Sequence, residues 1–266
     1  MSNKVKVENL YVRFTGENGD VQALEDISFA VKTGEFLVIL GPSGCGKSTL
    51  IRTIAGFQKP EKGRIMLDSK PVIEPGPDRI MIFQEFDQLF PWRTVEGNVE
   101  YALQVKGVPK EIRKQEARKF LEMVNLQDFA KAFPYQLSGG MKQRVAIARS
   151  LAINPEILLM DEPFGSLDAQ TRAILQAELI HIWQKVSSTI IFITHNIQEA
   201  ILLGDRVLVM TDNPGKVKEI VPVDIPRPRI PETPEFMALW QRLYALLEIK
   251  RFGENGLKEK SMVGMD

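Results

Sequence analysis

Residues 36–49 read FLVILGPSGCGKST, and this stretch decides the fold. Its first five residues are uniformly apolar, which is typical of a parallel strand buried on both faces. The following GPSGCGKST at 41–49 fits the pattern G-x-x-x-x-G-K-[ST] of a phosphate-binding loop. A helix is predicted from about Lys47 to Ala55, so the loop joins a strand to a helix, as such a loop requires. The stretch therefore predicts an α/β nucleotide-binding core.

The loop carries the groups that would hold ATP. Its glycines let the backbone wrap around phosphates with N–H groups pointing inward. Lys47 is expected to reach the β- and γ-phosphates, and Ser48 to ligate Mg²⁺. We interpret Cys45 as a small filler in the loop rather than a redox group. The predicted nucleotide-binding residues of this segment are Gly41, Pro42, Ser43, Gly44, Cys45, Gly46, Lys47, Ser48 and Thr49.

Two adjacent carboxylates end the apolar stretch ILLMDEP at 157–163. Successive side chains on a strand point to opposite faces, so Asp161 and Glu162 are expected to point in different directions. Asp161 is placed to hold Mg²⁺, directly or through water. Glu162 is placed to polarise an attacking water in line with the γ-phosphate. The alternative is a plain acidic turn, which is less favoured because the chain also carries a phosphate loop.

Two more polar residues follow predicted strands. His195 ends STIIFITH, and we expect it to contact the γ-phosphate because ligands bind at the carboxyl ends of parallel strands. The alternative is a structural histidine, which is how we interpret His181. Gln84 ends the predicted strand DRIMIFQ at 78–84, where it can reach both the metal and the attacking water. The predicted catalytic residues are Glu162, His195 and Gln84, and the predicted metal ligands are Ser48, Gln84 and Asp161.

A second anion-binding helix start lies at 137–144, LSGGMKQR. Free backbone N–H groups and the positive end of the helix dipole favour an anion at such a position. The segment falls in a region from about 88 to 155 that is predicted to be helical. The alternative is that it is only a glycine-containing helix start in an all-helical subdomain.

The other segments of the sequence predict further strands and helices around this core. Alternating residues at 4–14 and 21–31 predict antiparallel strands, and a long helix is predicted at about 168–187. RVLVMT and KVKEIVPVDI predict two further strands. The proline-rich segment 225–234 is expected to be extended. A last amphipathic helix is predicted from Phe236, Trp240, Leu243 and Leu247, and a loose polar tail is predicted after Gly253.

Composition narrows the class of protein. Of 266 residues, 44% are hydrophobic and 26% are charged, as in a globular protein. Lys+Arg and Asp+Glu balance at 34 each, which argues against a nucleic-acid partner. Cys45 is the only cysteine, so no intrachain disulfide can form and a Cys/His zinc site is disfavoured. A chain without disulfides suits a reducing cytosol. MSNKVKVENL lacks the apolar core of a signal peptide, and the longest apolar runs have strand length.

Over about residues 4–225 the chain resembles the ATP-binding cassette subunits of ABC transporters. The resemblance rests on GPSGCGKST, the glutamine of MIFQ, LSGGM, MDEP, SLD at 166–168 and His195, in that order. It implies a P-loop NTPase (RecA-like) core with an antiparallel β subdomain and an inserted α-helical subdomain, about 88–155, carrying LSGG. The implied division is an ATPase domain at 1–225 and a short extension at 226–266.

The resemblance also implies an answer to the question of why there are two anion sites. In this family two cassettes pack head to tail, and each ATP lies between the phosphate loop of one and the LSGG helix of the other. Ser138, Gly139 and Gly140 would donate to the γ-phosphate held by the partner subunit. Asp168 would touch the partner's phosphate loop. Phe14 would stack on adenine, with Tyr11 as the alternative.

The stretch after Gln84, FDQLFPWRTVEGN, matches the family's groove for a membrane permease. Phe86, Phe90, Pro91 and Trp92 suit such a socket; the alternative is that Phe90 and Trp92 belong to the helical core. The resemblance thus implies an ATPase on the cytoplasmic side of the membrane, peripheral to a permease, with a solute-binding protein as an indirect partner.

The LFPW run, LDAQTR and DIPRPR resemble the nitrate/sulfonate/taurine importer branch, which is similar here to cassettes for thiamine precursors. The cassette does not touch the cargo, so the solute stays open, as do export, a non-identical partner cassette and the role of the extension. DNA-repair and chromosome-organising cassettes need a coiled-coil insertion or zinc modules, and ribosome-associated ones carry two cassettes; neither pattern is found. Glu162 and His195 argue against a catalytically dead binding module.

Overall fold

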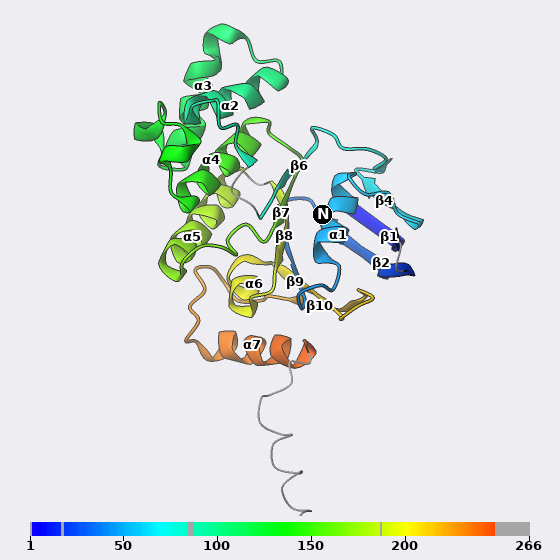
Figure 1. Ribbon diagram of the computed structural model, residues 1–266. Coiled ribbons are helices and arrows are strands. Elements are labelled where there is room, and N and C mark those ends of the chain that lie inside the picture. Colours follow the sequence, from blue (N-terminus) through cyan, green and yellow to red (C-terminus); the bar gives the residue numbers. More distant parts are fainter. Residues whose placement is uncertain (1, 17–18, 85–87, 187, 248–266) are drawn as a thin grey trace, which may run out of the picture.

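The computed structural model describes residues 2–16, 19–84, 88–186 and 188–247. Within these ranges the chain forms two sheets, a four-stranded sheet with the order β2-β1-β4-β5 and a six-stranded sheet with the order β10-β9-β3-β8-β7-β6. Helices cover the six-stranded sheet, and the smaller sheet lies to one side of it (Figure 1). The structure is therefore the α/β P-loop NTPase fold with an antiparallel β region that the sequence predicts.

The six-stranded sheet forms the centre of the fold. Its strands are β3 (Phe36–Leu40), β6 (Arg79–Ile82), β7 (Ile157–Asp161), β8 (Thr189–Thr194), β9 (Arg206–Met210) and β10 (Val217–Pro222). All neighbouring pairs are parallel except β9 and β10, which are antiparallel. All six were predicted from the sequence. One boundary was wrong, because β6 ends at Ile82 and Gln84 lies beyond the strand.

Side chains of this sheet alternate between two hydrophobic cores. Along β3, Phe36, Val38 and Leu40 lie in one core, whereas Leu37 and Ile39 lie in the other. β7 and β8 alternate in the same way, and every residue of the three strands is buried. Burial on both faces explains why these strands are continuous apolar runs in the sequence.

The two helices that follow glycine-containing loops lie on opposite faces of the sheet. α1 (Lys47–Ala55) contributes Leu50 and Ile51 to one core, and α4 (Gly139–Ala152) contributes Val145 to the other (Figure 1). The face of α4 also carries α2 (Val95–Val105), α3 (Lys110–Met123), α5 (Ala169–Val186) and α6 (Ile197–Leu203). The long helix was predicted correctly, except that Val186 is exposed rather than on the buried side; the short α6 was not predicted.

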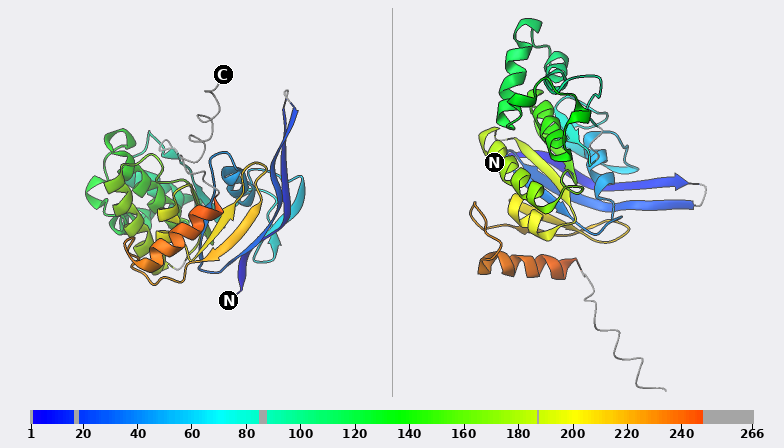
Figure 2. Two further views of the ribbon diagram at one scale, coloured as in Figure 1. Left: turned by 90° about the horizontal axis from the view of Figure 1, so that it is seen from below. Right: turned by 60° about the vertical axis from the view of Figure 1, so that its left-hand side comes forward.

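The smaller sheet begins with a long hairpin. β1 (Asn3–Gly16) and β2 (Gly19–Lys32) pair antiparallel, as predicted, and Figure 2 shows that the hairpin projects past the rest of the molecule. β4 (Lys62–Leu67) and β5 (Lys70–Pro71) extend this sheet and were not predicted. The sheet packs on α1 in the second core, so it stays beside the phosphate loop.

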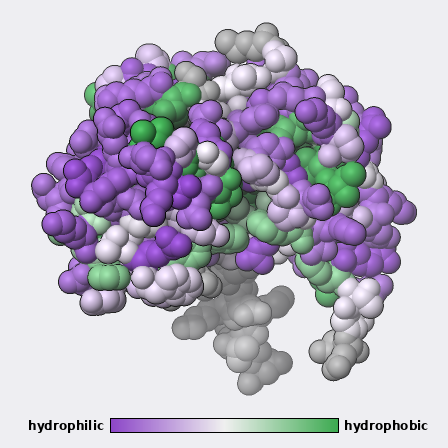
Figure 3. Space-filling model, turned by 90° about the horizontal axis from the view of Figure 1, so that it is seen from above, coloured by the Kyte–Doolittle hydropathy of each residue, from purple (hydrophilic) through white to green (hydrophobic). Residues whose placement is uncertain are grey.

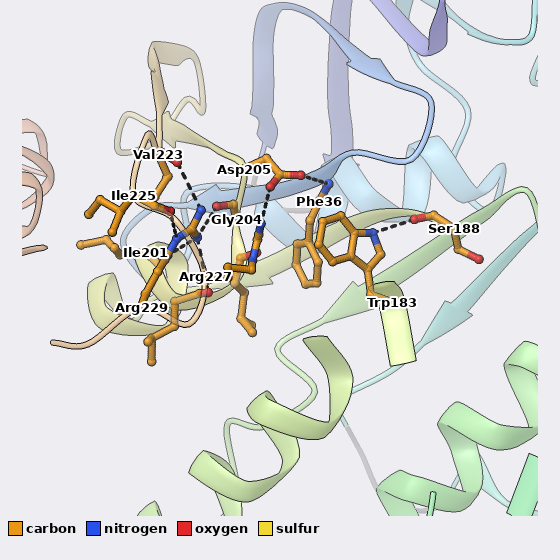
Figure 4. A network of polar contacts seen from close by, with 12 residues as sticks. Phe36, Trp183, Ser188, Ile201, Gly204, Asp205, Val223, Ile225, Arg227 and Arg229 are labelled. Atoms are coloured by element: carbon orange, nitrogen blue, oxygen red, sulfur yellow. Dashed lines mark hydrogen bonds and ion pairs between the residues drawn. The ribbon is translucent and has the colours of Figure 1, made fainter. Parts of the chain in front are cut away.

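The proline-rich segment after β10 is fastened to α6 by a buried arginine. Arg229 is 8% exposed and donates to the carbonyls of Ile201 and Gly204, both at 2.6 Å, at the end of α6 (Figure 4). It also donates to the carbonyls of Val223 and Ile225. Burial lowers the pKa of Arg229 to about 10, so the guanidinium stays charged at neutral pH. The carbonyls left free at the carboxyl end of α6 are thus capped by a side chain from the extension.

A second arginine strengthens this attachment. Arg227 pairs with Asp205 at 2.7 Å and lies over the ring of Trp183, and Asp205 also accepts from the N–H of Phe36 at the start of β3 (Figure 4). α7 (Pro234–Leu246) follows and buries Phe236 and Leu243 against the same core, while Trp240 and Leu247 pack partly against it. The predicted loose tail after Gly253 lies outside the described residues. The division at residue 225 stays a prediction.

The surface is mostly hydrophilic where Figure 3 views the molecule, with apolar side chains in small separate clusters. Within the described ranges no helix is both long and apolar enough to cross a membrane.

Replacing Arg229 tests the capping. Arg229→Met removes the donors to the carbonyls of Ile201 and Gly204 and leaves only the bond from Arg227 to the carbonyl of Leu203, so the free energy of unfolding should fall by about 2–4 kcal/mol. Arg242→Met removes an exposed arginine whose pairing with Glu219 is on the surface, and it should change the free energy by less than about 0.5 kcal/mol. Urea unfolding followed by circular dichroism measures both. Equal effects of the two substitutions would contradict the capping of α6 by Arg229.

Candidate active site

The phosphate loop turns sharply between β3 and α1. Gly44 and Gly46 have φ angles of 83° and 94°, in the left-handed region that favours glycine. A Cβ on Gly46 would lie 2.9 Å from the carbonyl oxygen of Ala23, whereas a Cβ on Gly44 would meet nothing within 4 Å. Gly46 is therefore required both by its dihedral angles and by the close approach of β2.

Lys47 lies at the start of α1 and points back into its own loop. Its side chain is 5% exposed and donates to the carbonyls of Gly41 at 2.9 Å and Pro42 at 2.8 Å. The neighbouring Cys45 is fully buried, and burial raises the pKa of its thiol. A buried neutral thiol is unreactive, which agrees with the filler role. Pro42 and Thr49 are half-buried, while Ser43 and Ser48 are exposed.

The order of the strands brings the candidate residues together. β3, β8 and β7 are neighbours, and their register pairs Leu40 with Thr194 and Asp161 with Ile193. The phosphate loop, His195 and Glu162 follow the carboxyl ends of these three strands. They meet at one edge because the strands are parallel.

Asp161 and Ser48 form an oxygen pair at this edge. The Ser48 hydroxyl donates to Oδ1 of Asp161 at 3.0 Å, and Asp161 is 5% exposed. Burial raises the pKa of Asp161, although the bond from Ser48 acts in the opposite direction. A hydroxyl and a carboxylate are hard oxygen ligands that suit Mg²⁺.

Glu162 lies between two cationic or potentially cationic groups. Its Oε1 is 3.8 Å from Nζ of Lys47, and its Oε2 is 2.9 Å from Nδ1 of His195. Asp161 and Glu162 do have different partners, as expected, but the reason given from strand alternation was wrong. β7 ends at Asp161, and Glu162 has a φ of 45°, so a left-handed turn directs its carboxylate.

Gln84 is exposed and lies close to the turn after Glu162. Its Nε2 would be 3.5 Å from a Cβ placed on Gly165, whose own N–H donates to the carbonyl of Glu162. The amide therefore reaches the neighbourhood of Glu162 although it does not end a strand.

The LSGG segment forms the start of α4. Ser138 is the exposed N-cap residue and accepts from the N–H of Met141 at 3.3 Å. Gly139 is half-buried, and Gly140 is buried where an added Cβ would lie 2.7 Å from Cγ2 of Thr171 on α5. Gly140 thus has a packing role in addition to the one that the sequence suggested.

The other two predicted nucleotide contacts are exposed. Asp168 accepts from the N–H of Thr171 at 2.9 Å, and this bond lowers the pKa of the Asp168 carboxyl. Phe14 is 43% exposed and pairs with Val21 on β2. Val21 is two residues before Ala23, whose carbonyl oxygen lies close to Gly46 of the phosphate loop. Tyr11, the alternative adenine contact, is half-buried with Nζ of Lys62 over its ring.

The two described aromatic residues of the predicted permease groove differ in exposure, and neither belongs to a hydrophobic core. Trp92 is 72% exposed, whereas Phe90 is half-buried against the ring of Tyr101 and the guanidinium of Arg149. Phe86 lies outside the described residues.

Comparison with known proteins agrees with this geometry. A family model described as ABC transporter matches residues 24–165. The taurine import ATP-binding protein TauB of Rhizobium johnstonii is 47% identical over 253 residues, covering 91% of this chain and 96% of that protein. The nitrate import ATP-binding protein NrtD of Synechocystis sp. is 46% identical over 222 residues, covering 84% and 83%.

A solved structure is also similar. A dimeric structure of the ATP-binding cassette MJ0796, in a post-hydrolysis state bound to ADP and Pi, superposes with a TM-score of 0.74. It is 33% identical and covers 83% of this chain and 99% of that one. The chain belongs to the ABC transporter family and is an ATP-binding cassette ATPase.

Two glycine substitutions test the loop. Gly44→Ala should cost about 1 kcal/mol of stability through its φ angle alone. Gly46→Ala should cost about 3 kcal/mol, because it adds a contact with a backbone oxygen, and it should weaken ATP binding. Thermal unfolding with and without ATP measures both effects. Equal destabilisation would show that the approach of Ala23 does not constrain the loop.

Proposed function

We propose that this chain is the subunit that binds and hydrolyses ATP to energise import of a small solute through a separate membrane permease. The observation that carries the proposal is the convergence of Lys47, Glu162 and His195 beside the Ser48–Asp161 pair. The names of two relatives, for taurine import and nitrate import, support import of an anion such as nitrate, sulfonate or taurine.

The proposed chemistry follows from the partners of each side chain. Lys47 donates to the loop carbonyls of Gly41 and Pro42, which keeps its ammonium group inside the loop, where it would meet the β- and γ-phosphates. Glu162 would accept a hydrogen bond from the attacking water and hold it in line. His195 would contact the γ-phosphate and fix the Glu162 carboxylate. Gln84 would help to orient the water.

Ser48, Asp161 and Gln84 are the proposed holders of Mg²⁺, which when bound neutralises charge on the phosphates. Mg²⁺ prefers oxygen ligands such as these. Burial raises the pKa of the Asp161 carboxyl, and a nearby cation would lower that pKa and stabilise the charged carboxylate. The loop residues from Gly41 to Thr49 would surround the phosphates, and Phe14 would stack on adenine.

We further propose that ATP is shared between two cassettes. α1 and α4 lie on opposite faces of the sheet, so Ser138 and Gly139 are more readily brought to the nucleotide of a second chain than to their own. Gly140 would contribute its N–H in the same way, and Asp168 would touch the partner's phosphate loop. The partner cassette is proposed to be a second copy.

The permease would contact the exposed Trp92, with Phe90 and Tyr101 supporting it from behind. This contact would place the chain at the cytoplasmic side of the membrane, peripheral to the permease, with a solute-binding protein as an indirect partner. Residues 1–225 are the proposed ATPase domain, with a helical part at about 88–155.

Glu162→Gln tests the catalytic assignment. The variant should still bind ATP, lose about 10³-fold or more in kcat, and accumulate as an ATP-bound dimer, because only the group that polarises water is removed. Phosphate release and light scattering with ATP measure the two effects. Turnover like that of the wild type would remove Glu162 from this role.

Trp92→Glu tests the permease contact. Purified from native membranes in mild detergent, the wild-type chain should bring a multi-span permease, and the variant should bring much less because a charge replaces the apolar anchor. Tyr135→Glu, at a ring that is 75% exposed elsewhere on the helical region, is the control and should retain the permease. Recovery of the wild type with nucleic acid or ribosomes would contradict the transport proposal.

A further inference from the structure

Two helices start directly behind the two ends of the site. α5 follows Asp168, the residue proposed to face the partner subunit, and α6 follows His195. On α5, Arg172 donates to the carbonyls of Phe164 at 3.3 Å and Leu167 at 2.7 Å. The first turn of α5 therefore holds the turn that carries Asp168, so a displacement of that turn would be transmitted to α5.

The start of α6 leaves a buried carboxylate free to contact α5. The sequence Asn196-Ile197-Gln198-Glu199 resembles a capping box, in which the glutamate would accept from the N–H of the N-cap residue. Here the side chain of Asn196 does accept from the N–H of Glu199 at 3.0 Å, but the N–H of Asn196 donates to Thr194 at 2.9 Å instead. The Glu199 carboxylate is thus available for another partner.

That partner is Gln176 on α5. Nε2 of Gln176 donates to Oε1 of Glu199 at 2.8 Å, and the two residues are 8% and 6% exposed. Burial raises the pKa of the Glu199 carboxyl, whereas the neighbouring side chains of Thr194 and Gln176 act to lower it. A hydrogen bond between buried side chains fixes the separation of the two helices, because breaking it leaves two polar groups unsatisfied.

Glu199 connects the pair to the proposed catalytic groups. Glu199 lines a cavity of about 30 Å³ together with Glu162, Arg172 and His195. The far end of α6 is capped by Arg229, so the helix is held at both ends and at Glu199. α6 therefore has little freedom to move independently of α5.

We propose that Gln176 and Glu199 are a positioning pair that couples the Asp168 turn to His195. A contact of the partner subunit at Asp168 would be transmitted along α5 to Gln176, then to Glu199 and His195. The position of His195 relative to Glu162 would thus respond to a contact of the partner at Asp168. This inference rests on the proposed function, since it assumes that Asp168 meets a second cassette.

The chain offers a direct probe, because His181 and His195 are its only histidines. His195 reports on the site, and the exposed His181 on α5 is the internal control. Gln176→Met is nearly isosteric and removes the hydrogen bond without changing charge. Gln184→Met, at an exposed glutamine on the same helix, is the matched control. The imidazole signals are recorded by NMR at one pH, and kcat and KM for ATP are measured on the same samples.

Gln176→Met should shift the His195 signal and not that of His181, and it should lower kcat on the order of tenfold or more with little change in KM, since the histidine is displaced rather than lost. The Asp168→Ala substitution should shift His195 in the wild-type background but not in the Gln176→Met background. The exchange Gln176→Glu with Glu199→Gln restores an amide–carboxylate pair and should recover most of kcat. Gln184→Met should match the wild type.

A loss of thermal stability in Gln176→Met with unchanged His195 signal and kcat would show a purely structural contact and overturn the proposal. Equal Asp168→Ala shifts in both backgrounds would do the same. If Gln176→Met does not fold, Glu199→Gln and the exchanged pair give the same comparison, and no recovery in the exchanged pair overturns the proposal. An inactive wild type would contradict the proposed function instead, so the two failures are distinguishable.

Discussion

The parallel pairing of β3, β8 and β7 is the constraint on which the site depends. Each strand ends at the same edge, and each is followed by one part of the proposed catalytic group: the phosphate loop, His195 or Glu162. No single local segment contains these residues together. Their distances are set by the register of the hydrogen-bonded ladder, and the strands themselves are held by burial on both faces. The rigidity of the sheet therefore determines how precisely the three parts of the site are positioned.

Burial on both faces has a second consequence. Each face must be covered, and the two coverings carry the two helix starts that are proposed to bind anions, α1 on one side and α4 on the other. A glycine at position 140 lets α4 approach the Thr171 side chain of α5, independently of any phosphate. The packing that stabilises one chain thus also separates its phosphate loop from its LSGG segment, which is the arrangement that a shared nucleotide between two chains needs.

The segment after β10 helps to hold the sheet and its covering helices together. Arg227 and Arg229 connect it to the start of β3 through Asp205 and to the end of α6, and α7 then covers the same core (Figure 4). Of the two proline-bracketed arginines, Arg229 is buried and Arg227 is half-buried, and both contact the core although their sequence looks like that of an extended linker.

The sequence predicted what local pattern determines. The strand, glycine loop and helix at 36–55 are contiguous, and their chemistry is readable without tertiary contacts. β5 and α6 were missed because they are short, and β4 was missed because its first half, Lys-Gly-Arg, is polar and exposed. The bond between Glu199 and Gln176 and the bonds from Arg229 to the end of α6 were missed because they join residues more than twenty positions apart. The left-handed turn at Glu162 could not be predicted, since a non-glycine residue adopts it only under tertiary constraint.

The most direct test of the shared site mixes two defective chains. One carries Glu162→Gln with Lys47→Ala and the other Glu162→Gln with Ser138→Arg, so each alone has a defect in every composite site. A mixed dimer combines both defects in one site and leaves the other with an intact phosphate loop and an intact LSGG segment. The account predicts that ATP leaves each variant monomeric and dimerises the mixture, as measured by light scattering. A mixture that stays monomeric, or either variant dimerising alone, would contradict it.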